Sequence, residues 1–224
     1  MARVCVFDVN ETLLDMGALD PHFEHVFGDV SARQAWFDQF LQLWLTEMVT
    51  GVYQEFATIG GAALKMLAEA RGVEVSDDEV GEILGTMKEM PPHPEVEDGL
   101  SHLRDAGFRL ATLTNSTGQV GEAQIENSGL HEYFEQTLSA DTAQRLKPAP
   151  EPYRMAAESL GVELGEIRLV AAHGWDIAGA LRAGCVAAFV NRPGKALFPT
   201  APPPDVIGAD LREVADRIIA AEGR

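Results

Sequence analysis

The sequence predicts an α/β protein with a Rossmann-like doubly wound parallel sheet and a helical cap subdomain inserted after the first strand. Short apolar runs, each long enough for one buried strand, alternate with stretches that have helical spacing. Glycines stand where several of these helices should end. One long segment after the first apolar run contains no convincing strand, so it interrupts the alternation and predicts the insertion.

Continuous apolar runs are typical of strands that are buried on both faces of a parallel sheet. The predicted strands cover residues 3–8, 108–113, 167–172 and 186–190. The predicted helices of the core cover residues 97–106, 118–128, 151–160, 176–184 and 210–222. This order of elements places each strand beside a crossover helix, as a doubly wound sheet requires.

The predicted cap begins with apolar side chains at helical spacing, among them Trp36, Phe40 and Trp44. Two further helices are predicted over about residues 54–71 and 76–89, and the segment PPHPEV closes the insertion with three prolines. The predicted domains are therefore a core of residues 1–15 and 92–224 and a cap of residues 16–91.

The composition limits the class of partner. The chain has 224 residues, 17 basic and 35 acidic, and a formal net charge of −18, which argues against nucleic acid or an anionic membrane surface. An anionic substrate would have to be attracted by a local positive group. The two cysteines, Cys5 and Cys185, are interpreted as reduced core thiols, and the N-terminal apolar run is too short for a signal peptide or a membrane span. We expect a cytoplasmic protein.

Polar residues end or follow the predicted strands one after another. Asp8 ends the first strand, at the edge of an α/β sheet where ligands bind. The other polar residues near strand ends are Thr114, Asn115, Lys147, His173, Asp176, Asn191 and Arg192. Because these ends meet at one edge, the pattern predicts a shared site.

These residues, in this order, resemble the haloacid dehalogenase superfamily over essentially the whole chain. FDVNETLLD is similar to its first motif, a nucleophilic aspartate with a threonine four residues later, and LTNS is similar to the second motif. LKP resembles the third motif, AAHGWDIAGALRAG resembles the fourth, and the helical insertion resembles the cap of the first cap class.

Two positions favour the L-2-haloacid dehalogenase branch over the phosphatases that dominate the superfamily. The phosphatases need an acid two residues after the nucleophile, where this chain has Asn10, whose amide cannot transfer a proton. They also need carboxylates in the fourth motif to hold Mg²⁺, and Asp176 is the single acid there. A dehalogenase needs neither, because halide is a weak base that leaves without a general acid.

The resemblance implies hydrolysis of short 2-haloalkanoic acids to 2-hydroxy acids, with inversion at C2, an aspartyl ester on the enzyme and no metal or cofactor. The substrate carboxylate and halide are the implied ligands. The implied catalytic residues are Asp8 as nucleophile, Thr12 to orient it, Lys147 to keep it ionised, and Asp176 with His173 to position water. Asp176 has a second interpretation, as the partner that holds Lys147.

The implied substrate-binding residues are Asn10, Arg33, Thr114, Asn115, Tyr153, Trp175 and Phe56. Arg33 opens the first cap helix and would face the leaving halide, whereas Trp175 and Phe56, together with Trp36 or Phe37 of the cap, would form an apolar wall. His173 and Ala171 depart from the best-known members, which have asparagine and serine at these positions, so the details of ester hydrolysis stay open.

Two other functions remain open at this point. The chain would be a phosphatase if Glu11 replaced the missing acid, or a binding member without activity if its site were incomplete. The preferred halogen, the chain length, the physiological substrate and the oligomeric state are also open, although relatives in this branch are often dimers.

Overall fold

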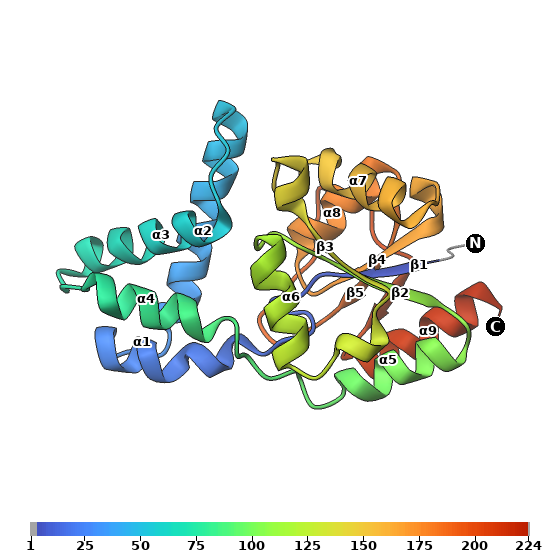
Figure 1. The fold of residues 1–224 in the computed structure, drawn as a ribbon, viewed down its shortest axis with the longest axis horizontal. Coiled ribbons are helices and arrows are strands. Elements are labelled where there is room, and N and C mark those ends of the chain that lie inside the picture. Colours follow the sequence, from blue (N-terminus) through green and yellow to red (C-terminus); the bar gives the residue numbers. More distant parts are fainter. Residues whose placement is uncertain (1–3, 224) are drawn as a thin grey trace.

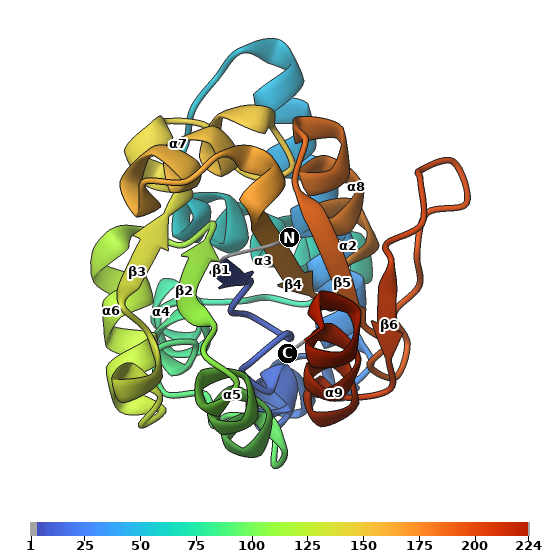
Figure 2. The ribbon, with the colours of Figure 1, turned by 90° about the vertical axis from the view of Figure 1, so that its right-hand side faces the viewer.

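The computed structural model describes residues 4–223, and within them the strands form a six-stranded parallel sheet in the order β3-β2-β1-β4-β5-β6 (Figure 1). Figure 2 shows this order across the sheet. The strands are β1 (Val4–Phe7), β2 (Arg109–Thr114), β3 (Gln136–Ser139), β4 (Ile167–Ala171), β5 (Val186–Val190) and β6 (Val206–Gly208). The chain order reverses direction at β1, which is the position where doubly wound sheets open a crevice for ligands.

Helices cover both faces of the sheet, as Figures 1 and 2 show. One face carries α5 (Val96–Asp105), α6 (Gly118–Asn127) and α9 (Leu211–Glu222). The other face carries α7 (Pro150–Leu160) and α8 (Gly174–Ala183). Short 3-10 turns lie at Met16–Leu19, His131–Tyr133, Ala140–Ala143 and Leu164–Glu166.

Strand β1 shows how the sequence builds this core. Cys5 and Phe7 pack into the apolar cluster on the α5 side, whereas Val4 and Val6 pack into the cluster on the α7 side. Successive side chains of a strand point to opposite faces, so an unbroken apolar run suits a strand that is covered on both sides. The next residue, Asp8, donates its backbone N–H to Val170 O at 3.0 Å and therefore stands at the carboxyl edge of the sheet.

The cap consists of four helices that lie to one side of the sheet in Figure 1. They are α1 (Asp20–Phe27), α2 (Ala32–Thr50), α3 (Phe56–Arg71) and α4 (Asp77–Thr86). Aromatic side chains of α2 fill the cap interior, and Trp36 Nε1 donates to Gly60 O of α3 at 2.9 Å. The two chain segments that enter and leave the cap meet where Asp15 N–H donates to Pro91 O at 2.8 Å. This contact supports the predicted boundaries near residues 15 and 91, which stay a prediction.

The four predicted strands are confirmed, with ends that shift by at most one residue, and Arg3 of the first one lies outside the described residues. Strands β3 and β6 and helix α1 were not predicted. Both strands lie at the edges of the sheet and have three or four residues, so they lack the long apolar run that marked the central strands. No helix of residues 4–223 is long and apolar enough to cross a membrane.

Helix α8 packs tightly against the loop that carries Lys147. A Cβ atom at Gly179 would lie 2.5 Å from Pro148 Cβ and 2.7 Å from Tyr153 Oη, whereas one at Gly81 on α4 would meet no atom within 4 Å. We expect Gly179→Ala to lower the free energy of unfolding by about 1–3 kcal/mol because the loop must move. Gly81→Ala is the matched control and should raise it by about 0.5–1 kcal/mol, because alanine favours the helix. Urea denaturation of both variants measures the difference, and an unchanged stability of Gly179→Ala would contradict the packing argument.

Candidate active site

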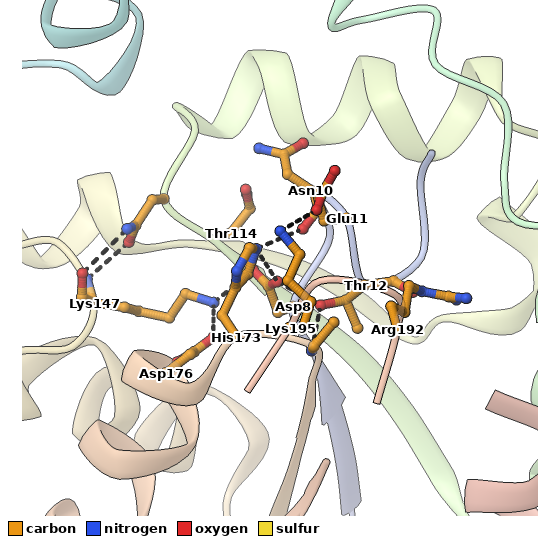
Figure 3. A network of polar contacts seen from close by, with 12 residues as sticks. Asp8, Asn10, Glu11, Thr12, Thr114, Lys147, His173, Asp176, Arg192 and Lys195 are labelled. Atoms are coloured by element: carbon orange, nitrogen blue, oxygen red, sulfur yellow. Dashed lines mark hydrogen bonds and ion pairs between the residues drawn. The ribbon is translucent and has the colours of Figure 1, made fainter. Parts of the chain in front are cut away.

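Asp8 lies buried at the carboxyl edge of the sheet and makes a hydrogen bond through each carboxylate oxygen (Figure 3). Thr12 Oγ1 donates to Oδ2 at 2.6 Å, and Lys147 Nζ donates to Oδ1 at 2.9 Å. Burial raises the pKa of Asp8, but attraction to Lys147 and the two hydrogen bonds oppose it, with attraction to His173 adding only when that ring is protonated, and the pKa lies below its usual value. The carboxylate is therefore ionised and oriented, as a nucleophile must be.

Lys147 connects Asp8 to Asp176. Its ammonium group is fully buried and donates to Asp176 Oδ2 at 2.6 Å as well as to Asp8. Asn115 fixes the backbone of Lys147: its Oδ1 accepts from Lys147 N–H at 2.7 Å, and its Nδ2 donates to Lys147 O at 3.2 Å. Asn115, which we expected to bind substrate, therefore uses both ends of its amide group to hold the backbone of Lys147.

Asp176 has fully buried partners on both carboxylate oxygens. Tyr153 Oη donates to Oδ1 at 2.5 Å, and Lys147 occupies Oδ2. Burial is the main cause that raises the pKa of Asp176 to about 6, and the nearby Asp8 charge adds to it, while Lys147 and Tyr153 oppose it. These contacts agree with the interpretation of Asp176 as the partner that holds Lys147. Tyr153, expected to bind substrate, contacts Asp176 instead.

His173 faces the nucleophile from the residue that precedes α8. Its Nε2 lies 3.8 Å from Asp8 Oδ2 and 3.2 Å from the backbone oxygen of Asn10. The imidazole is stacked between two rings, with centroid distances of 5.3 Å to Phe37 and 5.0 Å to Trp175. Burial lowers the pKa of His173, the Lys195 charge lowers it further, and Asp8 and Glu11 oppose both effects. The ring is neutral at neutral pH, so it can accept a proton.

The cap closes the site with aromatic side chains. Trp44 of α2 lies 5.3 Å from Trp175 and 5.4 Å from Phe56, measured between ring centroids. Trp175 and Phe56 thus take part in an apolar cluster, as expected of a wall. Trp44 Nε1 and Trp175 Nε1 are buried, and neither has a hydrogen-bond partner among residues 4–223. Buried N–H donors without an acceptor are uncommon in folded proteins.

Arg33 lies at the start of α2 but is held by two acids. Its Nε donates to Asp20 Oδ1 at 2.6 Å, and one terminal nitrogen contacts Glu11 Oε1 at 3.1 Å. Glu11 also forms an ion pair with Lys195. Phe37 is predicted from the sequence only as a wall residue, and Lys195 is not among the residues predicted for the site. The polar residues that follow β5 were the available signal for Lys195.

Two further expected residues have their polar atoms engaged inside the protein. Asn10 Oδ1 accepts from Gln124 Nε2 at 2.8 Å, and Thr114 Oγ1 accepts from Ser116 N–H at 3.1 Å. Both residues are buried in the site region (Figure 3). Their roles toward substrate stay predictions. Within the described part of the chain, no group of three His, Cys, Asp or Glu side chains is arranged to hold a metal ion.

The protein has a parallel sheet, an inserted helical cap and a buried aspartate at the carboxyl edge of the sheet. These features are typical of α/β enzymes whose aspartate at the end of the first strand takes part in the reaction. The family model described as haloacid dehalogenase-like hydrolase matches residues 2–184. The chain therefore belongs to the haloacid dehalogenase-like hydrolases.

Known dehalogenases are similar to the chain over most of its length. (S)-2-Haloacid dehalogenase 1 of Pseudomonas sp. (strain CBS-3) is 29% identical over 195 residues, which are 86% of each chain. A solved L-2-haloacid dehalogenase superposes with a TM-score of 0.92 at 25% identity, over 97% of this chain and 98% of the other. The Xanthobacter autotrophicus enzyme, solved with chloropropionic acid covalently bound, shares the fold with a TM-score of 0.89 at 23% identity, over 97% of this chain and 98% of that one.

We expect Lys147→Met to leave two buried carboxylates without their cation. At about pH 8 the free energy of unfolding should fall by about 3–5 kcal/mol, because an uncompensated buried charge remains. The pKa values of Asp8 and Asp176 would rise above those of the unfolded chain, so the folded state would bind protons more tightly and regain stability as the pH falls to about 5. Chemical denaturation at the two pH values measures this.

Lys65→Met is the matched control, because Lys65 pairs with Asp77 at the surface with 55% of its side chain exposed. Its loss should be about 0–1 kcal/mol at either pH. An equal loss at both pH values for Lys147→Met would contradict the buried network.

Proposed function

We propose that the protein hydrolyses the carbon–halogen bond of short 2-haloalkanoic acids and releases the 2-hydroxy acid with inversion at C2. The observation that carries the proposal is an ionised Asp8 held by Lys147 and Thr12, with no acid at position 10. The similarity to curated (S)-2-haloacid dehalogenases over most of the chain supports the same reaction.

In the first step, a carboxylate oxygen of Asp8 attacks C2, the carbon–halogen bond breaks, and halide leaves with the bonding pair. The product is an ester between Asp8 and the substrate. Lys147 keeps Asp8 ionised before the attack, and Thr12 limits its rotation because Thr12 Oγ1 also accepts from Ala172 N–H at 2.9 Å. No proton has to reach the leaving group, so Asn10 is compatible with this step.

The two unpartnered indole N–H groups of Trp44 and Trp175 are the proposed hydrogen-bond donors to the departing halide. Trp175 lies beside two neighbours of the nucleophile: Lys147 Nζ is 5.9 Å from its ring centroid, and His173 stacks on it. A halide that takes both hydrogen bonds would satisfy two buried donors that otherwise remain unpaired. Charge that develops during the attack is then stabilised from the cap side and the core side together.

In the second step, water attacks the carbonyl carbon of the Asp8 ester, and His173 accepts the proton. The Asn10 backbone oxygen, 3.2 Å from His173 Nε2, can only accept a hydrogen bond, so the neutral ring carries its hydrogen on Nε2 and Nδ1 is the nitrogen that accepts the proton. The tetrahedral intermediate then expels the alkoxide of the product, which takes the proton of the newly formed Asp8 carboxyl group. Asp8 is restored as a carboxylate, and His173 releases its proton to solvent. Lys147 and Asp176 remain a fixed ion pair throughout, so we assign water activation to His173 and the positioning of Lys147 to Asp176.

A phosphatase would need a protonated acid beside the leaving oxygen, and Glu11 does not meet this need. Glu11 would have to protonate the leaving oxygen, but it is held by ion pairs with Lys195 and Arg33. Burial raises the pKa of Glu11, yet the two cations outweigh it and the pKa lies below its usual value. The alternative of an inactive binding member does not explain why Asp8, Lys147 and Asp176 form a complete buried network.

A cytoplasmic location is part of the proposal. It is supported by Cys185, a buried thiol that forms no disulfide among the described residues. A homodimer stays a prediction from the branch that the sequence resembles.

The direct test follows oxygen through a single turnover in ¹⁸O-labelled water with excess enzyme and (S)-2-chloropropionate. We expect the first product to carry unlabelled oxygen and the label to appear in Asp8, located by peptide mass spectrometry. Asp8→Asn should release no halide. Labelled oxygen in the first product would instead show direct attack by water and would overturn the ester mechanism, and release of phosphate from phosphate esters without halide release would favour the phosphatase.

We expect His173→Phe to separate the two steps, because phenylalanine keeps the ring stack and removes the base. Halide should be released once per active site, after which the ester on Asp8 persists and its hydrolysis is slower by a factor of about 10²–10⁴. Intact-protein mass spectrometry would detect the ester. His131→Asn, at a surface position, is the control and should turn over normally. Full turnover by His173→Phe would show that another group activates water.

A further inference from the structure

The charges around Asp8 leave the substrate carboxylate without an evident cation. Lys147 lies between two carboxylates, so these three groups carry one negative charge above about pH 6. Arg33 is held by Asp20 and Glu11 on the cap side. The chain as a whole is strongly acidic, with a net charge of −18, so a haloacid anion has to be attracted by a local positive group.

Lys195 supplies such a group. It lies near the Phe37 ring of the stack around His173, whereas Lys147 lies near the Trp175 ring. Lys195 Nζ lies 5.4 Å from the centroid of Phe37, and Phe37 stacks on His173, whose Nε2 is 3.8 Å from Asp8 Oδ2. Only 11% of the Lys195 side chain is exposed. Figure 3 shows Lys195 drawn together with Glu11 and His173 at the site.

A cavity of about 170 Å³ lies beside this ammonium group, between α2 and the loop that follows β5. Its walls include Gln34, Phe37, Asp38 and Leu41 from the cap and His173, Trp175 and Lys195 from the core. The cavity therefore joins an apolar ring face, the Lys195 cation and the proposed base in one space, with the Asp38 carboxylate on its cap side. A short 2-haloacid has the matching parts, a small carbon chain and a carboxylate.

The backbone of Lys195 is held in place by the fold rather than by the cavity. Lys195 N–H donates to Arg192 O at 3.0 Å in a turn in which Gly194 has a φ of +78°. The next residue packs against the start of α8, where a Cβ atom at Gly174 would lie 2.3 Å from Ala196 O. The loop can approach α8 this closely because Gly174 has no side chain, and this contact directs Lys195 toward the site.

We propose that Lys195 binds the carboxylate of the 2-haloacid in the cavity between α2 and the loop after β5. The inference rests on the proposed function and names a substrate-binding residue for it. An ammonium group has three N–H donors, and the ion pair with Glu11 occupies one side of it, so donors remain for a second anion. Glu11 holds the side chain in place before substrate arrives, and the Phe37 ring below it limits access of water.

The first test compares Lys195→Met, which has a similar length and no charge, with Lys195→Arg, which keeps the charge. We expect Lys195→Met to raise KM for (S)-2-chloropropionate by a factor of about 10–100 with a smaller change in kcat, and Lys195→Arg to restore most of the affinity. The matched control is Lys65→Met, which should leave KM unchanged. The neutral substrate 2-chloropropionamide should show the same KM with wild type and Lys195→Met.

The second test separates binding by Lys195 from neutralisation of Glu11. In the double variant Lys195→Met/Glu11→Gln the ion pair is removed without leaving a buried negative charge. A KM that stays high in the double variant supports the proposal. A KM that returns to the wild-type value overturns it, because Lys195 would then act only by balancing Glu11.

An unchanged KM with a shifted pH profile would also overturn the proposal. Without the Lys195 charge, the pKa of His173 would rise, so the acidic limb of the rate would move to higher pH. Among the groups that face His173, Asp8, Glu11 and Lys195 are charged, whereas Phe37 of α2 and Trp175 of α8 are not. A shift of this limb alone would identify Lys195 as a residue that tunes the base.

A binding measurement keeps this inference distinct from the proposed function. Calorimetric titration with propionate, a carboxylate without a leaving group, should give a Kd for wild type that increases about 10–100-fold in Lys195→Met. If wild type releases no halide but this difference is found, the proposed function fails and the carboxylate site stands. If wild type releases halide and the two proteins bind propionate equally, the inference fails and the function stands.

Discussion

The buried ion pairs of Lys147 with Asp8 and Asp176 are the interaction on which the rest of the site depends. A lysine with no exposed side-chain surface is stable only when its charge is paired and its N–H groups have acceptors. The fold meets this demand by placing one lysine side chain between Asp8, which follows β1, and Asp176 in the first turn of α8. Asn115 fixes the backbone of the lysine loop, and the missing Cβ of Gly179 lets that loop approach α8.

The same network makes two aspartates behave differently. Asp8 has a cation, a neutral imidazole and a hydroxyl donor around it, and its pKa lies below the usual value. Asp176 has an equally buried carboxylate but also meets the charge of Asp8, and its pKa rises to about 6. The group with the lower pKa is the better choice for a permanently ionised nucleophile. The other can share the lysine proton without being needed as a base, and this leaves proton transfer to His173.

The cap contributes apolar side chains to the site more than it contributes charged groups. Aromatic side chains of α2 place Phe37 on His173 and Trp44 on Trp175, so the base and the proposed halide donors are shielded from water. Burial of this kind lowers the pKa of the imidazole and strengthens hydrogen bonds to an anion. The cation at the start of α2, Arg33, is engaged by Asp20 and Glu11, and the positive group beside the ring stack is Lys195 from the core.

The sequence by itself determined the fold class, the strand that ends on Asp8, and the chemistry that Asn10 disfavours. These conclusions depend on local patterns: apolar runs, helical spacing, prolines at a border and motif residues at strand ends. The tertiary structure decided which polar side chains meet. Asn115 turned out to hold the lysine loop, Tyr153 to hold Asp176, and Lys195 to join the site from a loop far along the chain. Hydrogen-bond partners and burial depend on distances between residues that are remote in sequence, so no local pattern specifies them. For the same reason the short edge strands β3 and β6 were visible only once the sheet placed neighbours beside them.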